Sequence, residues 1–141
     1  ELEITESMVM QDVESNNQLI QQLQSMGISF AIDDFGTGYS SFSYLKTLPV
    51  NTLKIDRTFI KDIPGDEVDM EITAAIVAVA HNLKLKVIAE GIETLEQQAF
   101  LMQLGCDLGQ GYLYSKPVAE DEFLTLIAEA TAWNEKRVLQ I

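Results

Sequence analysis

Two adjacent carboxylates, Asp33 and Asp34, end the apolar run that begins at Phe30, and a Gly-Thr-Gly segment follows almost at once. Other charged or polar side chains lie in or beside further runs that read as strands. The full set is Glu3, Glu6, Asp33, Asp34, Lys54, Asp56, Glu90, Glu93 and Gln110. Clustered carboxylates repel one another and resist desolvation, and hard divalent cations with oxygen ligands offset both effects. These residues predict a metal site, provided that the fold brings them together.

The adjacency of Asp33 and Asp34 suits two metal ions rather than one. Two neighbouring side chains of a regular strand point to opposite faces, but at a strand end, where the backbone turns, both can reach one site. One carboxylate can then bridge two ions about 3.5–4 Å apart while its neighbour binds one of them. Gly36 and Gly38 would let the following loop bend closely over such a site.

Strand-like and helix-like segments alternate along the chain. Strands are expected over 2–5, 28–33, 52–56, 86–90 and 111–115, and helices over 15–27, 41–48, 66–83, 94–105 and 121–133. Capping-box spacing marks helix starts at Ser15 with Gln18 and at Thr94 with Gln97. Repeated strand–helix units predict a parallel sheet with the helices outside it. In such a fold the carboxyl ends of the strands meet at one rim, where ligands bind.

The length allows two versions of this α/β fold. A closed (β/α)8 barrel takes about 250 residues, so the five strands expected in 141 residues amount to a little over half of one. A complete doubly wound sheet is the rival, because such folds fit this length. The chain starts at Glu1 inside an alternating apolar run, so we expect a piece of a longer protein.

The composition limits the kinds of molecule that this chain can bind and the compartment in which it works. The net charge of −13 argues against a nucleic-acid polymer or an anionic membrane as a direct partner. Hydrophobic residues make up 47% of the chain, enough for a core, and the longest apolar stretch, AAIVAVA, is too short to span a bilayer. The single cysteine, Cys106, excludes an internal disulfide and fits a reducing compartment. We predict a cytoplasmic domain, which leaves room for a membrane anchor elsewhere in the parent protein.

Each polar signal has an ordinary alternative when it is taken singly. Asp33 and Asp34 before a glycine form a solvated turn in many proteins. Lys54 and Asp56 are two apart and could form a structural ion pair. Independent surface charges would not collect at successive strand ends, and this favours the functional interpretation.

Two further residues also have simple interpretations. Glu90 and Glu93 could be the charged start of the helix that follows Thr94. His81 is the single histidine and lies near the end of a long helix, away from the rim, so packing or a helix-dipole position is expected for it. Neither a zinc site nor a Ser-His-Asp triad is expected.

The motifs ELEITES, AIDDFGTGYSS, LKIDRTFI, VIAEGIET and GCDLGQGYLYSKP occur together in this order. In order and approximate spacing they resemble EAL domains, the phosphodiesterases that hydrolyse the bacterial second messenger cyclic di-GMP. The resemblance covers nearly the whole chain. It implies that residues 1–141 are the C-terminal part of one EAL domain, an incomplete TIM-like (β/α)8 barrel.

The resemblance also implies roles for the residues of the rim. Glu3, Asp33 and Asp34 match metal ligands, Asp33 being shared by two Mg²⁺ or Mn²⁺ ions. The remaining matches are Glu90 as water-activating base or part of the second-metal shell, Lys54 near the attacking water and scissile phosphate, Glu6 as anchor of the FGTGYSS loop, and Asp56, Glu93 and Gln110 as supporting positions around metals and guanine.

The expected reaction is hydrolysis of cyclic di-GMP to linear pGpG. The Glu-Ala-Leu motif that names the family, with its metal ligand, is not in this chain. We therefore expect the chain on its own to be inactive and to require the remainder of the barrel. Exposed sheet edges make pairing with a second copy possible. The alternative function is a catalytically silent cyclic di-GMP receptor or protein-interaction module.

Overall fold

The computed structural model describes residues 1–9, 13–37 and 45–128. Five strands form one parallel sheet in the order β1-β2-β3-β4-β5. They are β1 (Leu2–Thr5), β2 (Phe30–Phe35), β3 (Thr52–Ile55), β4 (Lys86–Ala89) and β5 (Leu108–Gly109). The helices are α1 (Glu6–Val9), α2 (Val13–Ser25), the 3₁₀ turn η1 (Arg57–Phe59), α4 (Glu67–Asn82), α5 (Leu95–Gln103) and a helical segment over 120–128.

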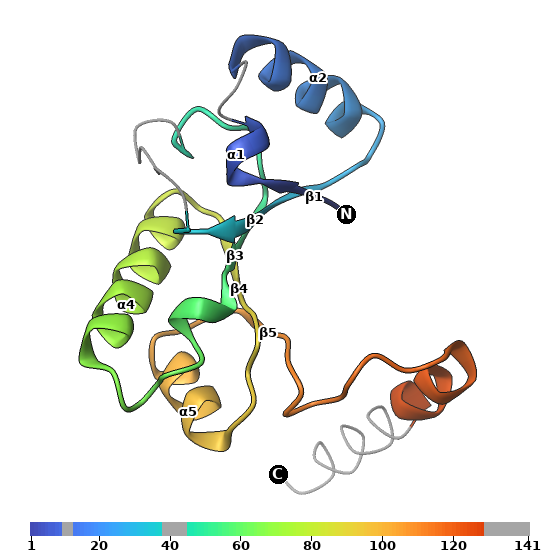
Figure 1. Cartoon of the computed structure of the whole chain (residues 1–141). Coiled ribbons are helices and arrows are strands. Elements are labelled where there is room, and N and C mark those ends of the chain that lie inside the picture. The colour runs from blue at the N-terminus through green and yellow to red at the C-terminus, as the bar shows by residue number, and fades with distance from the viewer. Residues whose placement is uncertain (10–12, 38–44, 129–141) are drawn as a thin grey trace, which may run out of the picture.

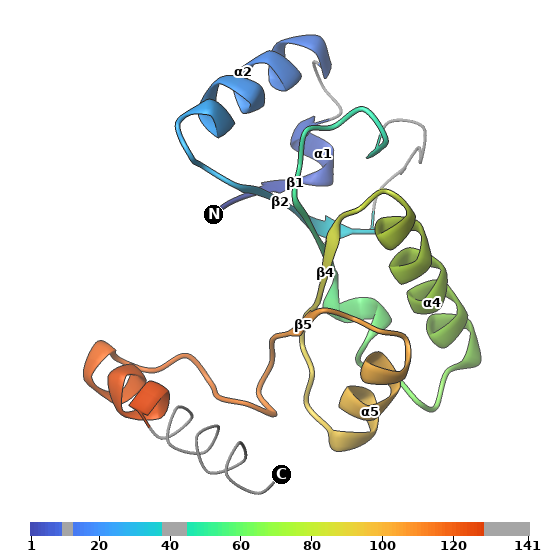
Figure 2. The same ribbon diagram turned by 180° about the vertical axis from the view of Figure 1, so that it is seen from behind.

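The helices follow one another around the sheet (Figures 1 and 2). In both views α4 and α5 lie side by side, α2 lies near β1, and the segment after β5 extends away from the sheet. The core is formed where the helices cover the strands. Leu53, Ile55 and Val87 are fully buried there, and Ile76 and Ala80 pack on them from α4. Burial on both faces explains why the central strand β3 reads as a buried run.

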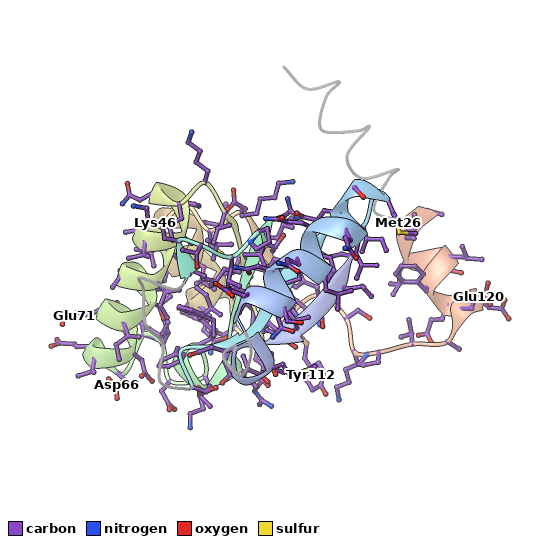
Figure 3. The ribbon with its side chains drawn as sticks, turned by 90° about the horizontal axis from the view of Figure 1, so that it is seen from above. Met26, Lys46, Asp66, Glu71, Tyr112 and Glu120 are labelled. Carbon is purple, nitrogen blue, oxygen red and sulfur yellow. The ribbon has the colours of Figure 1, made fainter. Side chains whose placement is uncertain are left out.

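Local signals set the helix starts. Asp66 accepts hydrogen bonds from the backbone of Val68 and Asp69 and begins α4. Thr94 and Gln97 form the expected capping box of α5. In Figure 3 the side chain of Glu71 on α4 points away from the sheet, as the amphipathic pattern requires.

Three expectations for the helices need correction or fall outside the described residues. Ser15 does not cap α2, because the helix already includes Val13. Residues 41–44 of the helix expected over 41–48 lie outside the described residues, and the last helix is described only for 120–128.

The predicted range of the fifth strand was wrong. It was expected over 111–115, but β5 is Leu108–Gly109, and Gln110 follows the strand rather than opening it. Tyr-Leu-Tyr alternates like a strand, yet Leu113 donates its backbone N–H to the Ile92 carbonyl and Tyr114 donates to Gly111, which makes a turn. A side chain at Gly111 would come within 2.1 Å of the Ile92 carbonyl oxygen, so the chain bends over the segment after β4.

The strand order excludes a doubly wound sheet. Such a sheet reverses its strand order at a switch point, whereas here each strand pairs with its neighbours in sequence. Sequential parallel pairing is the connectivity of a (β/α)8 barrel. Among the described helices, none has the length and apolar character that crossing a membrane requires.

Asp107 stabilises the start of β4 and the end of α4 through its side chain. Its Oδ2 accepts a hydrogen bond from the Val87 backbone at 2.8 Å and lies 3.0 Å from Nε2 of His81. The Val87 bond first, and then His81, hold the pKa of Asp107 below its ordinary value. This stabilisation is present above the unfolded pKa of 3.8 and is lost as the pH falls through the depressed folded pKa. We expect Asp107→Ala to lower the unfolding free energy by about 1–2 kcal/mol at neutral pH, and by less at acidic pH.

Urea unfolding of the protein at several pH values measures this difference. Asp62→Ala is the control, because that exposed carboxylate lies 3.4 Å from Lys61 in a surface pair; we expect a change below about 0.5 kcal/mol. An Asp107→Ala effect that is the same at neutral and strongly acidic pH would contradict the assignment.

Candidate functional site

A buried lysine joins three carboxylates from three neighbouring strands. The Nζ atom of Lys54 on β3 lies 2.7 Å from Oε1 of Glu3 on β1 and 3.0 Å from Oδ1 of Asp33 on β2. It also lies 2.7 Å from Oε1 of Glu90, directly after β4. Burial would lower the pKa of Lys54, but the carboxylates of Glu3, Glu90 and Asp33, which face its ammonium group, raise it above the ordinary lysine value. The lysine is therefore a cation in the folded protein.

A β-bulge brings both aspartates of β2 to this end of the sheet. Ile32 pairs with Leu53 and Phe35 with Ile55. Between these two pairs β2 therefore has one residue more than β3. The φ angle of Asp34 is +55°, in the left-handed region. Asp33 meets Lys54, while the pKa of Asp34 is raised by partial burial and then by the charges of Asp33 and Asp56. The backbone turn thus leaves both carboxylates at the same end of the sheet, where Asp33 faces Lys54 and Asp34 lies near Asp33 and Asp56.

Asp56 anchors the next element. Its Oδ1 accepts from the backbone N–H of Thr58 at 2.9 Å and also from the Thr58 hydroxyl, so it caps η1. Burial would raise the pKa of Asp56, but the Thr58 hydrogen bonds lower it. The possible ion pair between Lys54 and Asp56 is not what forms, because the ammonium contacts the other three carboxylates.

Glu6 holds the start of the loop after β2. Its Oε2 accepts from the backbone N–H of Gly36 at 3.2 Å, and the residue is buried. Gly36 has φ +98°, and a Cβ there would lie 2.8 Å from the Phe59 ring. The glycine is required by both the backbone angle and the close packing, while residues 38–44 of the same loop lie outside the described residues.

Glu93 and Gln110 line a small cavity beside Glu90. The cavity has a volume of about 190 Å³ and is also lined by Arg57 and Tyr112. Nη2 of Arg57 lies 2.7 Å from Oε1 of Glu93, and the Glu93 backbone donates to Gln97. No role was expected for Arg57 from the sequence. Its position directly after Asp56 was the available signal.

The acidic residues fit hard divalent cations by their chemistry. Glu3, Asp33, Asp34 and Glu90 offer only oxygen donors, the ligands that Mg²⁺ and Mn²⁺ prefer. Asp33 Oδ1 is buried and, despite its 3.0 Å contact with Nζ, makes no hydrogen bond of good geometry. Such an oxygen suits a metal contact. Within the described residues, however, no three acidic, imidazole or thiol side chains stand close enough to hold an ion as they are.

His81 takes no part in this site. It contacts Asp107, which precedes β5 and so lies at the opposite end of the strands from Glu90. The expectation of a structural role for His81 agrees with that position.

The fold and the rim define a parallel α/β protein of the TIM-barrel kind, with its polar residues at the carboxyl ends of the strands. The chain belongs to the EAL domain family, whose model matches residues 1–117. EAL domains are TIM-barrel folds, so the expected partial TIM-like barrel is confirmed.

Named relatives support this membership. The chain is 52% identical over 127 residues to the cyclic di-GMP phosphodiesterase NbdA of Pseudomonas aeruginosa, covering 88% of this chain and 16% of NbdA. It is 48% identical to the solved MucR phosphodiesterase in complex with c-di-GMP, with a TM-score of 0.82, covering 86% of this chain and 49% of that one. MucR is a bifunctional diguanylate cyclase and phosphodiesterase of the same organism.

A more distant structure bears on metals. BlrP1 of Klebsiella pneumoniae was solved with c-di-GMP and either manganese or calcium. It is 36% identical to this chain, with a TM-score of 0.75, covering 82% of this chain and 29% of BlrP1. The chain thus spans about half or less of the relatives that it matches here.

Gly91 generates a prediction at the edge of the site. It has φ +71°, and a Cβ there would lie 2.3 Å from Cγ of Arg57. Gly27 has a similar φ of +89° but open space around it. We expect Gly27→Ala to cost about 1–3 kcal/mol of stability from backbone strain. Gly91→Ala should cost at least about 1 kcal/mol more, because the new methyl group meets Arg57.

Urea unfolding of the two single variants and of the double variant Gly91→Ala/Arg57→Gly, which lacks every Arg57 side-chain atom near Gly91, separates the two terms, with the Arg57→Gly single variant as its reference. The double variant should recover the excess cost and retain the strain. Equal losses in Gly27→Ala and Gly91→Ala would show that Arg57 does not pack against Gly91.

Proposed function

We propose that this chain contributes the acidic rim of a metal-dependent phosphodiesterase that hydrolyses cyclic di-GMP to linear pGpG. The observation that supports this most is the convergence of Glu3, Asp33 and Glu90, from three strands, on the buried ammonium of Lys54. Removing these charged groups from water costs free energy. Clusters of this kind are common at sites that bind or react with charged substrates. The names of NbdA and MucR supply the substrate class.

In this proposal Glu3, Asp33 and Asp34 would hold Mg²⁺ or Mn²⁺. When bound, a pair of such ions lowers the pKa of water and neutralises phosphate oxygens. Glu90 is the candidate base, because its carboxylate lies beside the same residues and can accept a proton from water. Lys54 supplies positive charge near the phosphate and adds to electrostatic stabilisation of the transition state.

The remaining rim residues act by positioning. Glu6 holds the backbone at Gly36, Asp56 caps η1, and Glu93 and Gln110 line the cavity beside Glu90. We propose that the cavity accommodates part of the nucleotide next to the reacting phosphate. Residues 1–141 would be one part of an EAL domain, completed by the remainder of the barrel.

We further propose a cytoplasmic location and no direct nucleic-acid polymer partner, in line with the net charge of −13 and the single cysteine. Pairing with a second copy through sheet edges stays a proposal. A catalytically silent receptor is the alternative, and activity measurements distinguish the two.

Glu90→Gln tests the proposed chemistry in the complete protein that contains this chain. The substitution keeps the size of the side chain and removes its ability to take a proton. We expect kcat for pGpG formation to fall by about 10²–10⁴-fold, since general-base catalysis contributes that much. Chromatographic separation of cyclic di-GMP, pGpG and GMP measures the rate with Mg²⁺ or Mn²⁺, with Ca²⁺ and with chelator.

Glu96→Gln, on the exposed start of α5, is the matched control and should retain full activity. Ca²⁺ should support little turnover, because its larger and looser coordination does not hold the same geometry. A wild-type protein that binds cyclic di-GMP but forms no pGpG with Mg²⁺ or Mn²⁺ would favour the receptor.

The isolated 141-residue chain should show little or no turnover. It spans 49% of the MucR phosphodiesterase chain, so about half of such a structure has no counterpart in it. The same chromatographic assay, with the complete protein as positive control, measures this. Metal-dependent pGpG formation by the isolated chain would contradict the expectation that the remainder of the barrel is needed.

A further inference from the structure

The ammonium of Lys54 faces three carboxylates of the proposed site, two of which belong to proposed metal ligands. An ammonium group has three N–H donors, and three carboxylates lie 2.7–3.0 Å from Nζ. The Lys54 side chain is 5% exposed, so water does not share these contacts to any large extent. The lysine is a resident cation at the centre of the acidic cluster.

One positive charge does not balance the cluster. Five carboxylates gather here, from Glu3, Asp33, Asp34, Asp56 and Glu90, against the single ammonium. Arg57, the nearest other cation along the chain, is paired with Glu93. The cluster retains a net negative charge that attracts a further cation.

The orientation of the carboxylates shows what a divalent ion would meet. Oxygens of Glu3, Asp33 and Glu90 are turned toward Nζ, and in the described part of the chain no three acidic side chains stand ready to hold an ion. An ion bound by Glu3 and Asp33 would lie close to a buried like charge, which is unfavourable at low dielectric. These ligands come from paired strands, so the ammonium is not needed to bring their backbones together.

We propose that Lys54 competes with the divalent ion for Glu3 and Asp33 and thereby sets the metal affinity of the site. The ammonium gives up at least one of its three contacts when an ion binds, and it is thereby freed toward the substrate phosphate. In the absence of the ion the lysine limits repulsion between the strand ends. This inference rests on the metal site of the proposed function.

Lys54→Met tests the inference in the complete protein, because methionine fills a similar buried volume without charge. Isothermal titration with Mn²⁺ alone, in the absence of nucleotide, measures the affinity. We expect at least 10-fold tighter binding than in the wild type. Lys61→Met removes an exposed surface lysine and should leave the affinity unchanged. Unchanged or weaker Mn²⁺ binding by Lys54→Met would overturn the inference.

Lys54→Arg separates charge from packing. It keeps the positive charge, so Mn²⁺ affinity should stay at or below the wild-type value. An increase in Lys54→Arg equal to that in Lys54→Met would overturn the inference, since loss of packing would then explain both.

A measurement on the wild-type protein covers the case in which Lys54→Met does not fold. The Nζ and side-chain NMR signals of Lys54 should shift during a Mg²⁺ titration, with those of Lys61 as reference. Saturable Mg²⁺ binding that leaves the Lys54 signals unmoved would overturn the inference. No binding of either ion by the wild type or the variants would contradict the proposed metal site itself, and so both proposals together.

Discussion

The burial of Lys54 among carboxylates is the constraint on which the site depends. A lysine 5% exposed in the middle of β3 would be strongly unfavourable without partners, since removal from water penalises the charged form. Glu3, Asp33 and Glu90 offset that penalty, and each comes from a different part of the chain. Their mutual repulsion is in turn reduced by the ammonium. The lysine and the three acids would each be unfavourable in this place without the other. The favourable contacts form only when the strands pair in the observed register.

Parallel pairing meets this requirement through simple geometry. Thr5 pairs with Asp33, and Lys54 with Ile88, so the carboxyl ends of β1 to β4 come to one side of the sheet. The bulge in β2 adds a second aspartate to the same end. Close packing around it is allowed by glycines, at Gly36 against Phe59 and at Gly91 against Arg57. Backbone shape therefore contributes to the site together with the charged side chains.

Family membership agrees with the concentration of acidic residues at one end of the sheet. The chain spans about half of the MucR structure to which it is similar, and a barrel distributes its rim residues over all of its strands. Much of this fold and of its acidic rim could be predicted from sequence patterns. The alternation of strands and helices, the capping box at Thr94 and the acidic strand ends are local signals, and each has a direct physical cause in the chain. The fifth strand was misplaced because alternation in the segment 111–115 can be produced by a turn that packs on Ile92.

The sequence by itself determined the parallel α/β class, the position of the acidic residues near strand ends and the position of His81 away from them. These follow from periodicity and from the position of each residue in its element. Only the tertiary structure decided the pairing of charges. Lys54 joins Glu3, Asp33 and Glu90 rather than Asp56, and Arg57 joins Glu93. These contacts connect residues 21 to 51 positions apart, so strand register, the β2 bulge and burial select them, and no local pattern records that choice.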